Sequence, residues 1–423
     1  MPSKPTDPSR RQFLRKVAAT AAAPYVITSS ALGAGDRPAA SQRITMGMIG
    51  TGMRGSHVLA GFLADPRTQC LAACDVDSQR RARAKQTIDA KHGNTDCTEY
   101  GDFRELIRRT DVDVVAIATP DHWHVPIAVR ACKQGKDVYC EKPLSLTIRG
   151  ARAAVTAARR YERVFQVGTQ NRSNPAAVFG CNLFREGGLG GYRYIEVGTW
   201  GISRPCNFPA EPVPPHVDWE MFLGPAPWRP FHPVLQRGKG WIPYRDYSGG
   251  GTTDVGAHLF DLAQLALGTE HTGPVEVTPL DPAKHNGRCV AFRYADGRML
   301  YRRTPGNDVK FVGTRGSIHM VTCAWVDVRY DPKELALEAA AGDRTLSYSS
   351  NNHAANFLDS VGSRKKPAAD VELGCRAATI CHIGNIAQWL GRPLRWNPEK
   401  EEFVGDEQAN HWLDRARREP WDV

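Results

Sequence analysis

The sequence lacks the patterns that mark several protein classes. Its 11 cysteines form no CxxC pair and no Cys/His spacing typical of a zinc site, so we expect no bound metal. Several of them (Cys70, Cys74, Cys140 and Cys289) lie in apolar runs, which favours buried thiols over a disulfide framework. The longest basic cluster, residues 364–366, has no aromatic residues interleaved, which argues against nucleic-acid binding.

Charge and composition are ordinary as well. The formal net charge of the 423 residues is +10, and the first 40 residues contribute +4 of it, so the remainder carries only a mild excess. The chain is 41% hydrophobic and 24% charged, which excludes a disordered or collagen-like protein. Its length allows two to three domains and a large buried core.

The first 35 residues have the pattern of an export signal. Arg10 and Arg11 form a twin-arginine pair, and a weakly apolar, alanine-rich stretch follows at 17–34. An amphipathic first helix is the alternative, but Pro24 interrupts the stretch. It is also short and weak for a membrane span. We therefore expect a periplasmic or otherwise exported protein, which fits the missing disulfide pattern because the twin-arginine route exports folded proteins.

Residues 43–171 alternate short β-branched runs with helical segments. Such alternation, with apolar strands, predicts a parallel sheet covered by helices on both faces. The expected strands are 44–49, 69–75, 112–119, 137–140 and 164–168, and the expected helices are 55–64, 78–91, 122–134 and 147–161.

A glycine-rich turn follows the first expected strand. It reads Gly50, Thr51, Gly52, Met53, Arg54, Gly55 and opens the first expected helix. In this context Gly50 permits a tight turn, Gly52 lets the backbone approach a pyrophosphate, and Gly55 allows close helix–strand packing. The helix N-terminus faces the phosphates. The turn therefore predicts a bound dinucleotide.

An acidic residue points to the kind of dinucleotide. Asp75 lies 20 residues beyond Gly55, at the end of the second expected strand, where a carboxylate can accept hydrogen bonds from ribose hydroxyls. Its charge disfavours a 2′-phosphate, so we expect NAD. Arg80 and Arg81 argue in the opposite direction, and NADP stays the less favoured alternative.

Three further motifs accompany the glycine turn. They are the segment Thr119, Pro120, Asp121, His122, Trp123, His124; the segment Glu141, Lys142, Pro143, Leu144; and residues 249–258, which read GGGTTDVGAH. In this order the motifs resemble the Gfo/Idh/MocA oxidoreductase family over roughly residues 44–423. The family includes inositol and sugar dehydrogenases and glucose–fructose oxidoreductase.

The resemblance implies an α/β protein of two domains. A Rossmann dinucleotide-binding domain (43–171) would precede an α/β domain (172–423) with a large open, mostly antiparallel sheet that binds substrate and forms a homodimer or homotetramer. The sequence agrees, because 192–200 alternates, short strand-like runs fill 275–348, and 352–363 and 373–390 have helical patterns.

Alcohol oxidation needs a proton acceptor and positive charge near the developing alkoxide. In the family the lysine that matches Lys142 hydrogen-bonds the reacting oxygen. Asp254 and His258 are spaced i,i+4, so on one helix face Asp254 would orient His258, the expected base. Asp261 is an alternative orienting carboxylate. The structural alternatives are a surface lysine at 142, and a helix N-terminal aspartate beside a packed histidine.

Other candidates are less specific. His122 and His124 would lie near the nicotinamide or pack internally, and Trp241 and Tyr244 would stack on a sugar or pack within their loop. The expected cofactor contacts are Gly50, Thr51, Gly52, Met53, Arg54, Gly55, Asp75, Thr119, Pro120, His122, His124, Glu141 and Lys142. The expected substrate contacts are Lys142, Asn171, Arg172, Trp241, Tyr244, Asp254 and His258.

Together these features predict an exported NAD(H)-dependent oxidoreductase that acts on a hydroxyl of a sugar, cyclitol or glycoside and resembles inositol 2-dehydrogenase. Little free NAD is available outside the cytoplasm, so the cofactor would be tightly held and recycled. One alternative is an NAD-dependent glycosidase that works by redox-neutral oxidation and elimination. Another is a non-catalytic sugar-binding protein.

Overall fold

The computed structural model describes residues 33, 38–322, 326–335 and 352–422. The chain divides into two units, 1–43 and 44–423. In the first unit, apart from Gly33, the predicted export signal lies outside the described residues, and a short 3-10 helix, η1, spans Ala40–Gln42. No helix in the described ranges is both long and apolar enough to cross a membrane.

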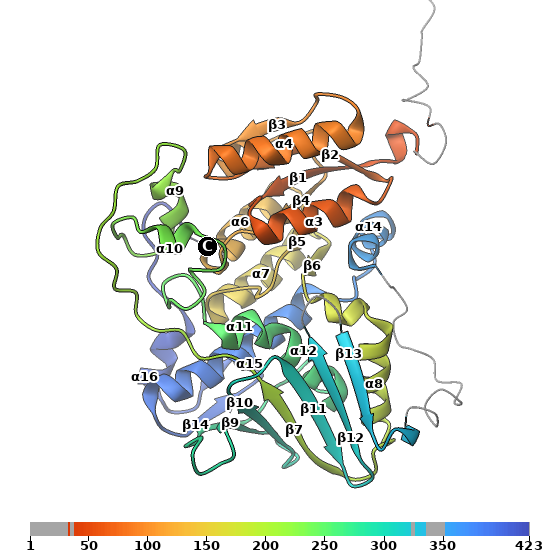
Figure 1. Ribbon diagram of the computed structural model, residues 1–423, viewed down its shortest axis with the longest axis vertical. Coiled ribbons are helices and arrows are strands. Elements are labelled where there is room, and N and C mark those ends of the chain that lie inside the picture. Colours follow the sequence, from red (N-terminus) through yellow and green to blue (C-terminus); the bar gives the residue numbers. More distant parts are fainter. Residues whose placement is uncertain (1–32, 34–37, 323–325, 336–351, 423) are drawn as a thin grey trace, which may run out of the picture. The chain divides into compact units, whose positions relative to one another are not determined.

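The predicted parallel sheet is present in the second unit (Figure 1). Its described strands run in the order β3-β2-β1-β4-β5-β6, and every pair is parallel. The strands are β1 (Ile44–Ile49), β2 (Thr68–Cys74), β3 (Thr98–Tyr100), β4 (Val114–Ile117), β5 (Asp137–Cys140) and β6 (Phe165–Val167). The helices are α3 (Met53–Leu63), α4 (Ser78–His92), α5 (Phe103–Ile107), α6 (Asp121–Lys133) and α7 (Ile148–Arg160).

Burial on both faces explains the nearly continuous apolar strands. Met46 and Met48 of β1 pack with Phe62 of α3 in one core cluster, whereas Ile49 and Ile117 belong to another. The five predicted strands and four predicted helices are confirmed, with small shifts of their ends. The sequence analysis missed β3 and α5. Two of the three β3 residues are exposed, so that strand has no hydrophobic pattern to detect.

The second described sheet is mixed and mostly antiparallel, as predicted. Its order is β13-β12-β11-β7-β10-β9-β8-β14-β15, and among the described pairs only β7 and β10 run parallel. The strands are β7 (Tyr192–Gly198), β8 (Glu276–Pro279), β9 (Arg288–Arg293), β10 (Met299–Arg303), β11 (Asp308–Gly313), β12 (Ser317–Thr322), β13 (Val326–Asp331), β14 (Leu394–Asn397) and β15 (Glu402–Phe403).

Helices cover one face of this sheet. Residues of α8 (Pro175–Arg185), α12 (Gly256–Leu267) and α15 (Val371–Leu390) share one core cluster with its buried strand residues. The remaining described helices are short or peripheral: α9 (Trp219–Leu223), α10 (Pro233–Gln236), α11 (Gly251–Asp254), α14 (His353–Ser363), α16 (Glu407–Asn410), η2 (Gln170–Ser173) and η3 (His411–Leu413).

Later parts of the chain return to the first sheet. Phe357 of α14 packs edge-on against Phe62 of α3, and Trp421 packs against Trp123 of α6. Residues beyond 171 therefore complete the core of the first domain.

The long loop between β7 and α11 is ordered and has a core of its own. Trp219, Phe231, Tyr244 and Tyr247 form that core with their neighbours. The indole nitrogen of Trp123 donates hydrogen bonds to two carbonyls of α9, which joins the loop to α6. The loop thereby supplies one wall of the cleft described below.

Candidate functional site

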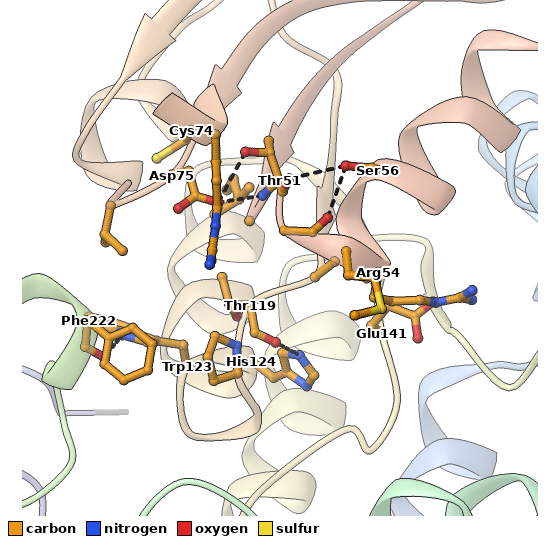
Figure 2. Close-up of a pocket in the computed structure, with 18 of the residues that line it drawn as sticks. Thr51, Arg54, Ser56, Cys74, Asp75, Thr119, Trp123, His124, Glu141 and Phe222 are labelled. Carbon is orange, nitrogen blue, oxygen red and sulfur yellow. Dashed lines mark hydrogen bonds and ion pairs between the residues drawn. The ribbon is translucent and has the colours of Figure 1, made fainter. Parts of the chain in front are cut away.

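A cleft of about 820 Å³ runs from the glycine turn to the end of β5. Its lining includes Gly50, Gly52, Asp75, Thr119 and Lys142, and parts of the long loop. Figure 2 shows Thr51 and Asp75 on one side of the opening and Trp123 and His124 below them. Carboxyl ends of parallel strands are where open α/β sheets bind ligands.

The three glycines of the turn serve different purposes. Gly50 has a φ of +85°, and a Cβ there would lie 2.7 Å from the carbonyl of Ala118. A Cβ on Gly55 would lie 1.9 Å from the carbonyl oxygen of Gly50. At Gly52 the nearest atom would be Nη1 of Arg80, 3.6 Å away. Gly50 and Gly55 are therefore required by the fold, whereas Gly52 leaves open space toward the cleft.

Asp75 ties the glycine turn to β2. Its Oδ2 accepts hydrogen bonds from the backbone N–H of Thr51 at 2.7 Å and from the Thr51 hydroxyl at 3.1 Å (Figure 2). Its Oδ1 accepts from the N–H of Asp77 at 2.9 Å. Burial raises the pKa of Asp75 despite these bonds. The carboxyl group also lines the cleft, where a ribose hydroxyl can reach it.

The two arginines beside Asp75 are already engaged. Arg80 pairs with Asp77 at 3.3 Å and donates to the carbonyl of Gln236 at 2.8 Å. Arg81 donates to the Asp75 carbonyl at 3.1 Å. Arg80 also lines the cleft, with its Nη1 toward Gly52, whereas Arg81 is not among the described lining residues.

The two histidines of the segment 119–124 differ in position. Among the described lining residues His124 is present and His122 is not. His122 is buried with its Nε2 2.9 Å from the carbonyl of Phe222. The two ring nitrogens of His124 lie 2.7 Å from the Pro143 carbonyl and 2.9 Å from the Thr119 carbonyl. His122 thus packs internally, and His124 joins the end of β4 to the turn that carries Lys142.

An ion-pair network forms the far end of the cleft. The ammonium of Lys142 donates to the carboxylate Oδ1 of Asp254 at 2.6 Å and to its backbone carbonyl at 2.7 Å. Lys239, from the long loop, lies 3.2 Å from Oδ2 of the same carboxylate. Burial opposes ionisation of Asp254, but the two ammonium groups outweigh it and hold its pKa at about 2.

A second ion pair, between Arg54 and Glu141, also lines the cleft. Glu141 is buried and accepts a hydrogen bond from Nη2 of Arg54 at 2.8 Å. Gln170 donates to the same carboxylate at 2.8 Å. Burial opposes the charge of Glu141, but the nearby guanidinium lowers its pKa overall. Arg54 thereby links the glycine turn to the motif of Lys142.

The expected partnership of Asp254 with His258 is wrong. Helix α11 ends at Asp254 and α12 begins at Gly256, so the two side chains do not share one continuous helix. Asp254 bonds the lysines instead. The Nδ1 of His258 is buried and, among the described residues, has no hydrogen-bond partner. Burial and the nearby charges of Lys142 and Arg54 lower the pKa of His258 well below its ordinary value.

Two other candidate residues, Asp261 and Arg172, bind each other in the interior of the protein. Asp261 does not orient His258, because it pairs with Nε of Arg172 at 2.6 Å. Arg172 is buried and also pairs with Glu270 at 2.6 Å, so its role is structural.

Two aromatic candidates also differ. Tyr244 is buried in the loop core, whereas Trp241 lines the cleft. Among the described lining residues Asn171, Arg172, Tyr244 and His258 are not found. The sequence analysis missed Lys239 and the partnership of Arg54 with Glu141, for which no motif exists. The length and aromatic content of the loop were the available signals.

Two family models match the chain. An oxidoreductase family with an NAD-binding Rossmann fold (GFO_IDH_MocA) matches residues 44–169, which include the glycine turn and Lys142. The C-terminal alpha/beta domain of the same oxidoreductase family matches residues 199–423, which include Lys239 and Asp254.

Curated relatives align with part of the chain. A glycosyl hydrolase family 109 protein of Saccharopolyspora erythraea is 38% identical over 157 residues, which are 33% of this chain and 34% of that protein. Inositol 2-dehydrogenase of Rubrobacter xylanophilus is 32% identical over 152 residues, 36% of this chain and 42% of that protein. The chain therefore matches less than half the length of these two relatives.

A solved structure extends the likeness over the whole fold. Levoglucosan dehydrogenase in complex with NADH and levoglucosan has a TM-score of 0.58 and 18% identity, covering 86% of this chain and 100% of that chain. At this identity the likeness shows a common fold. Together with the matched models, which cover more than half of the sequence, it shows that this chain belongs to the Gfo/Idh/MocA oxidoreductase family and begins, in its described fold, with an NAD-binding Rossmann domain.

Proposed function

We propose that the protein is an NAD(H)-dependent oxidoreductase that acts on a hydroxyl group of a sugar, cyclitol or glycoside. The observation that carries the proposal is the Lys142–Asp254 ion pair, which lies in the same cleft as the glycine turn. An ammonium group at the end of a dinucleotide cleft is the feature that stabilises a developing alkoxide. Relatives that act on carbohydrate or cyclitol hydroxyls support the substrate class.

The residues present fit a dinucleotide. The open space over Gly52 admits a pyrophosphate, α3 begins directly behind it, and Asp75 lines the cleft beyond. When bound, the nicotinamide accepts or returns a hydride. Gly52, Thr51 and Asp75 would hold the nucleotide, and Glu141 with Arg54 would lie toward its reactive end.

Lys142 positions the reacting oxygen. A lysine ammonium has three N–H donors, and Asp254 takes two of those of Lys142. The third is left for a substrate hydroxyl. As negative charge develops on that oxygen, the fixed ammonium stabilises it without reorganising. With only 13% of its side chain exposed, Lys142 acts where water screens the charge weakly.

We propose His258 as the acceptor of the hydroxyl proton because its position matches the family motif; in the described structure it lies next to the cleft-lining Asp254 segment and is not itself among the lining residues. Asp254, with a pKa of about 2, is a poor proton acceptor at neutral pH. Burial and the charges of Lys142 and Arg54 lower the pKa of His258, so its imidazole is neutral at neutral pH and would readily pass on a proton that it takes.

The experiment that tests this function uses the purified full chain. Denaturation should release a nicotinamide nucleotide, or the protein should bind added NAD. A panel of sugars, cyclitols and glycosides should then produce the absorbance band of reduced nicotinamide with at least one member. Failure of every substrate class to reduce bound NAD would contradict the proposal.

We also propose a preference for NAD over NADP. The engaged states of Arg80 and Arg81 and the position of Asp75 support it. Titration of the protein with both nucleotides should give the lower dissociation constant for NAD. A lower constant for NADP would mean that Arg80 leaves Gln236 to bind the 2′-phosphate.

The second candidate is an NAD-dependent glycosidase that works by oxidation and elimination. The 38% identity of a third of the chain to a glycosyl hydrolase family 109 protein favours it. Release of p-nitrophenol from aryl glycosides without added cofactor distinguishes the two. Cleavage of glycosides, with no sugar able to reduce the cofactor, would replace the first proposal by the second.

Three further proposals concern the protein's setting. The twin arginines Arg10 and Arg11 support export with the cofactor retained and recycled, and substitution of both by lysine should leave the protein in the cytoplasm.

The face of the second sheet that carries Tyr194, Glu196 and Tyr301 is partly exposed and supports a homo-oligomer. Light scattering should give the mass of a dimer or tetramer. A monomer would refute that proposal.

A further inference from the structure

The long loop places one charged side chain at the catalytic end of the cleft. Gln236 of this loop donates to Asp77 at 2.8 Å, and its carbonyl accepts from Arg80 at 2.8 Å. Gly238 approaches Met53 of the glycine turn so closely that a Cβ would contact the methionine at 3.4 Å. Lys239 follows directly and points to Asp254. The loop is thus held against the glycine turn and α4 just before Lys239, which brings the ammonium of Lys239 to Asp254.

The ammonium of Lys239 has donors to spare. Its side chain is 57% exposed, against 13% for Lys142. Within the described residues it contacts one carboxylate, Asp254, at 3.2 Å. One of its three N–H donors is therefore engaged, and two face the cleft or solvent. The buried carboxylate of Asp254 also accepts a shorter bond from Lys142, at 2.6 Å, and its backbone carbonyl accepts a second one at 2.7 Å, so Lys239 is the weaker of its two ammonium partners.

The charges at this end of the cleft do not cancel. Arg54, Lys142 and Lys239 line it, and Glu141 and Asp254 are the carboxylates that face them. Asp121 also lines the cleft, but its carboxyl group is directed to the Ser248 hydroxyl, from which it accepts a hydrogen bond at 2.7 Å. Arg54 pairs with Glu141 and Lys142 with Asp254. Lys239 shares Asp254 with Lys142 and, within the described residues, has no carboxylate of its own.

We propose that Lys239 determines substrate specificity by binding a carboxylate of the substrate, so that the preferred substrate is a sugar acid such as a uronate. This inference rests on the proposed oxidoreductase function. Lys239 and Lys142 contact the same small carboxylate, so one substrate can place its hydroxyl at Lys142 and its carboxylate at Lys239. A single surplus ammonium matches one negative charge. Phosphate groups are more often met by arginine forks or several cations.

The test compares matched acidic and neutral sugars on the NAD-loaded full chain. The pairs are D-glucuronate with D-glucose and D-galacturonate with D-galactose, and D-glucose 6-phosphate is the phosphate arm. The wild-type protein should have a kcat/KM at least about tenfold higher for the uronates, because a hydrogen bond between charged groups is worth about 10- to 100-fold. Equal values for both members of each pair, or the highest value for the phosphate ester, would overturn the proposal.

Variants then locate the effect. Lys239→Gln should raise KM for the uronates about 10- to 100-fold more than it raises KM for the neutral sugars, and Lys239→Arg should restore most of that difference. Lys284→Gln, at a lysine whose side chain is 79% exposed in the turn between β8 and β9, is the matched control and should change nothing. An equal fall of kcat with acidic and neutral sugars would show that Lys239 acts only through Asp254, which would refute the proposal.

A binding measurement separates this inference from the proposed function. Calorimetry should show D-glucuronate binding to the NAD-loaded wild type more tightly than D-glucose, with the difference lost in Lys239→Gln. If this difference is found while no sugar reduces NAD, the oxidoreductase function fails and the carboxylate site stands. If neutral sugars are oxidised and the difference is missing, only the carboxylate site fails.

Discussion

The two ends of the cleft are built in different ways. At the nucleotide end, six consecutive residues form the turn, backbone geometry requires glycine at positions 50 and 55, and Asp75 binds the backbone of Thr51. At the catalytic end, Lys142, Lys239 and Asp254 come from three distant segments and are joined by ion pairs. Backbone requirements produce a local pattern that can be recognised in the sequence. An ion pair between residues about a hundred positions apart produces no such pattern. The first end is therefore specified by local steric limits and the second by tertiary packing.

The largest expected effect lies at the catalytic end. Lys142→Met should lower kcat about a thousandfold, because it removes the charged donor to the reacting oxygen. NAD binding should change little, since the glycine turn and Asp75 are untouched. Steady-state kinetics and a nucleotide titration measure the two quantities, and Lys284→Met is the control. An equally large loss of NAD affinity would contradict the proposal that the two ends of the cleft serve separate purposes.

The nucleotide end can be tested by two alanine substitutions in one turn. Gly55→Ala places a Cβ 1.9 Å from the Gly50 carbonyl oxygen and should lower the free energy of unfolding by about 3 kcal/mol. Gly52→Ala meets nothing closer than 3.6 Å and should leave stability nearly unchanged while it weakens NAD binding about tenfold or more. Denaturant titration measures the stability of the two variants, and nucleotide titration measures their affinity for NAD. Equal stability losses would contradict the different purposes assigned to these glycines.

A smaller effect distinguishes the proton acceptor from its neighbour. His258→Asn should lower kcat about a hundredfold, in the lower range for loss of a general base, and should abolish the acidic limb of the pH–rate profile. Asp254→Asn should mainly raise the mobility of Lys142, so its residual activity should keep that limb. An unchanged profile in His258→Asn would remove this histidine from the reaction.

The smallest expected effect concerns His382, which supports the segment that follows Lys142. The Nε2 of His382 in α15 lies 2.9 Å from the carbonyl of Ser145, three residues after Lys142, and burial lowers the pKa of this histidine from 6.5 to about 4. Below pH 6.5 the unfolded chain takes up a proton that the folded state refuses, so the stabilisation by neutral His382 is lost on acidification.

His382→Asn should therefore be less stable than wild type at neutral pH. The gap should close by about 2 kcal/mol on going from about pH 7 to about pH 5, since asparagine does not titrate. Denaturant titrations at the two pH values measure it, with His271→Asn at an exposed position as the control. A gap that stays constant would show that His382 takes up a proton in the folded protein as readily as in the unfolded chain.

The comparison of the two ends also shows what the sequence could predict. The strands of the first sheet, the glycine turn and Asp75 were predictable, because apolar runs, glycine spacing and strand ends are local features. The antiparallel character of the second sheet followed from the family resemblance. The short strand β3 was not predictable, because its exposed residues carry no hydrophobic pattern.

Partnerships across the fold were beyond sequence reasoning. The i,i+4 spacing of Asp254 and His258 predicted an interaction, but the helix is interrupted at Val255 and the carboxylate turns to the lysines. Arg172 looked like a crevice residue from its position, yet Asp261 and Glu270 hold it in the interior. Lys239 belongs to no motif, and its position near Asp254 depends on the conformation of the long loop.

The most direct test of this account is a crystal structure of the full chain with NAD. The account predicts the pyrophosphate over Gly52 and the nicotinamide ring next to Lys142, with room for one hydroxyl-bearing carbon between the ring and the ammonium. A nucleotide bound elsewhere, or a ring turned away from the Lys142–Asp254 pair, would contradict it.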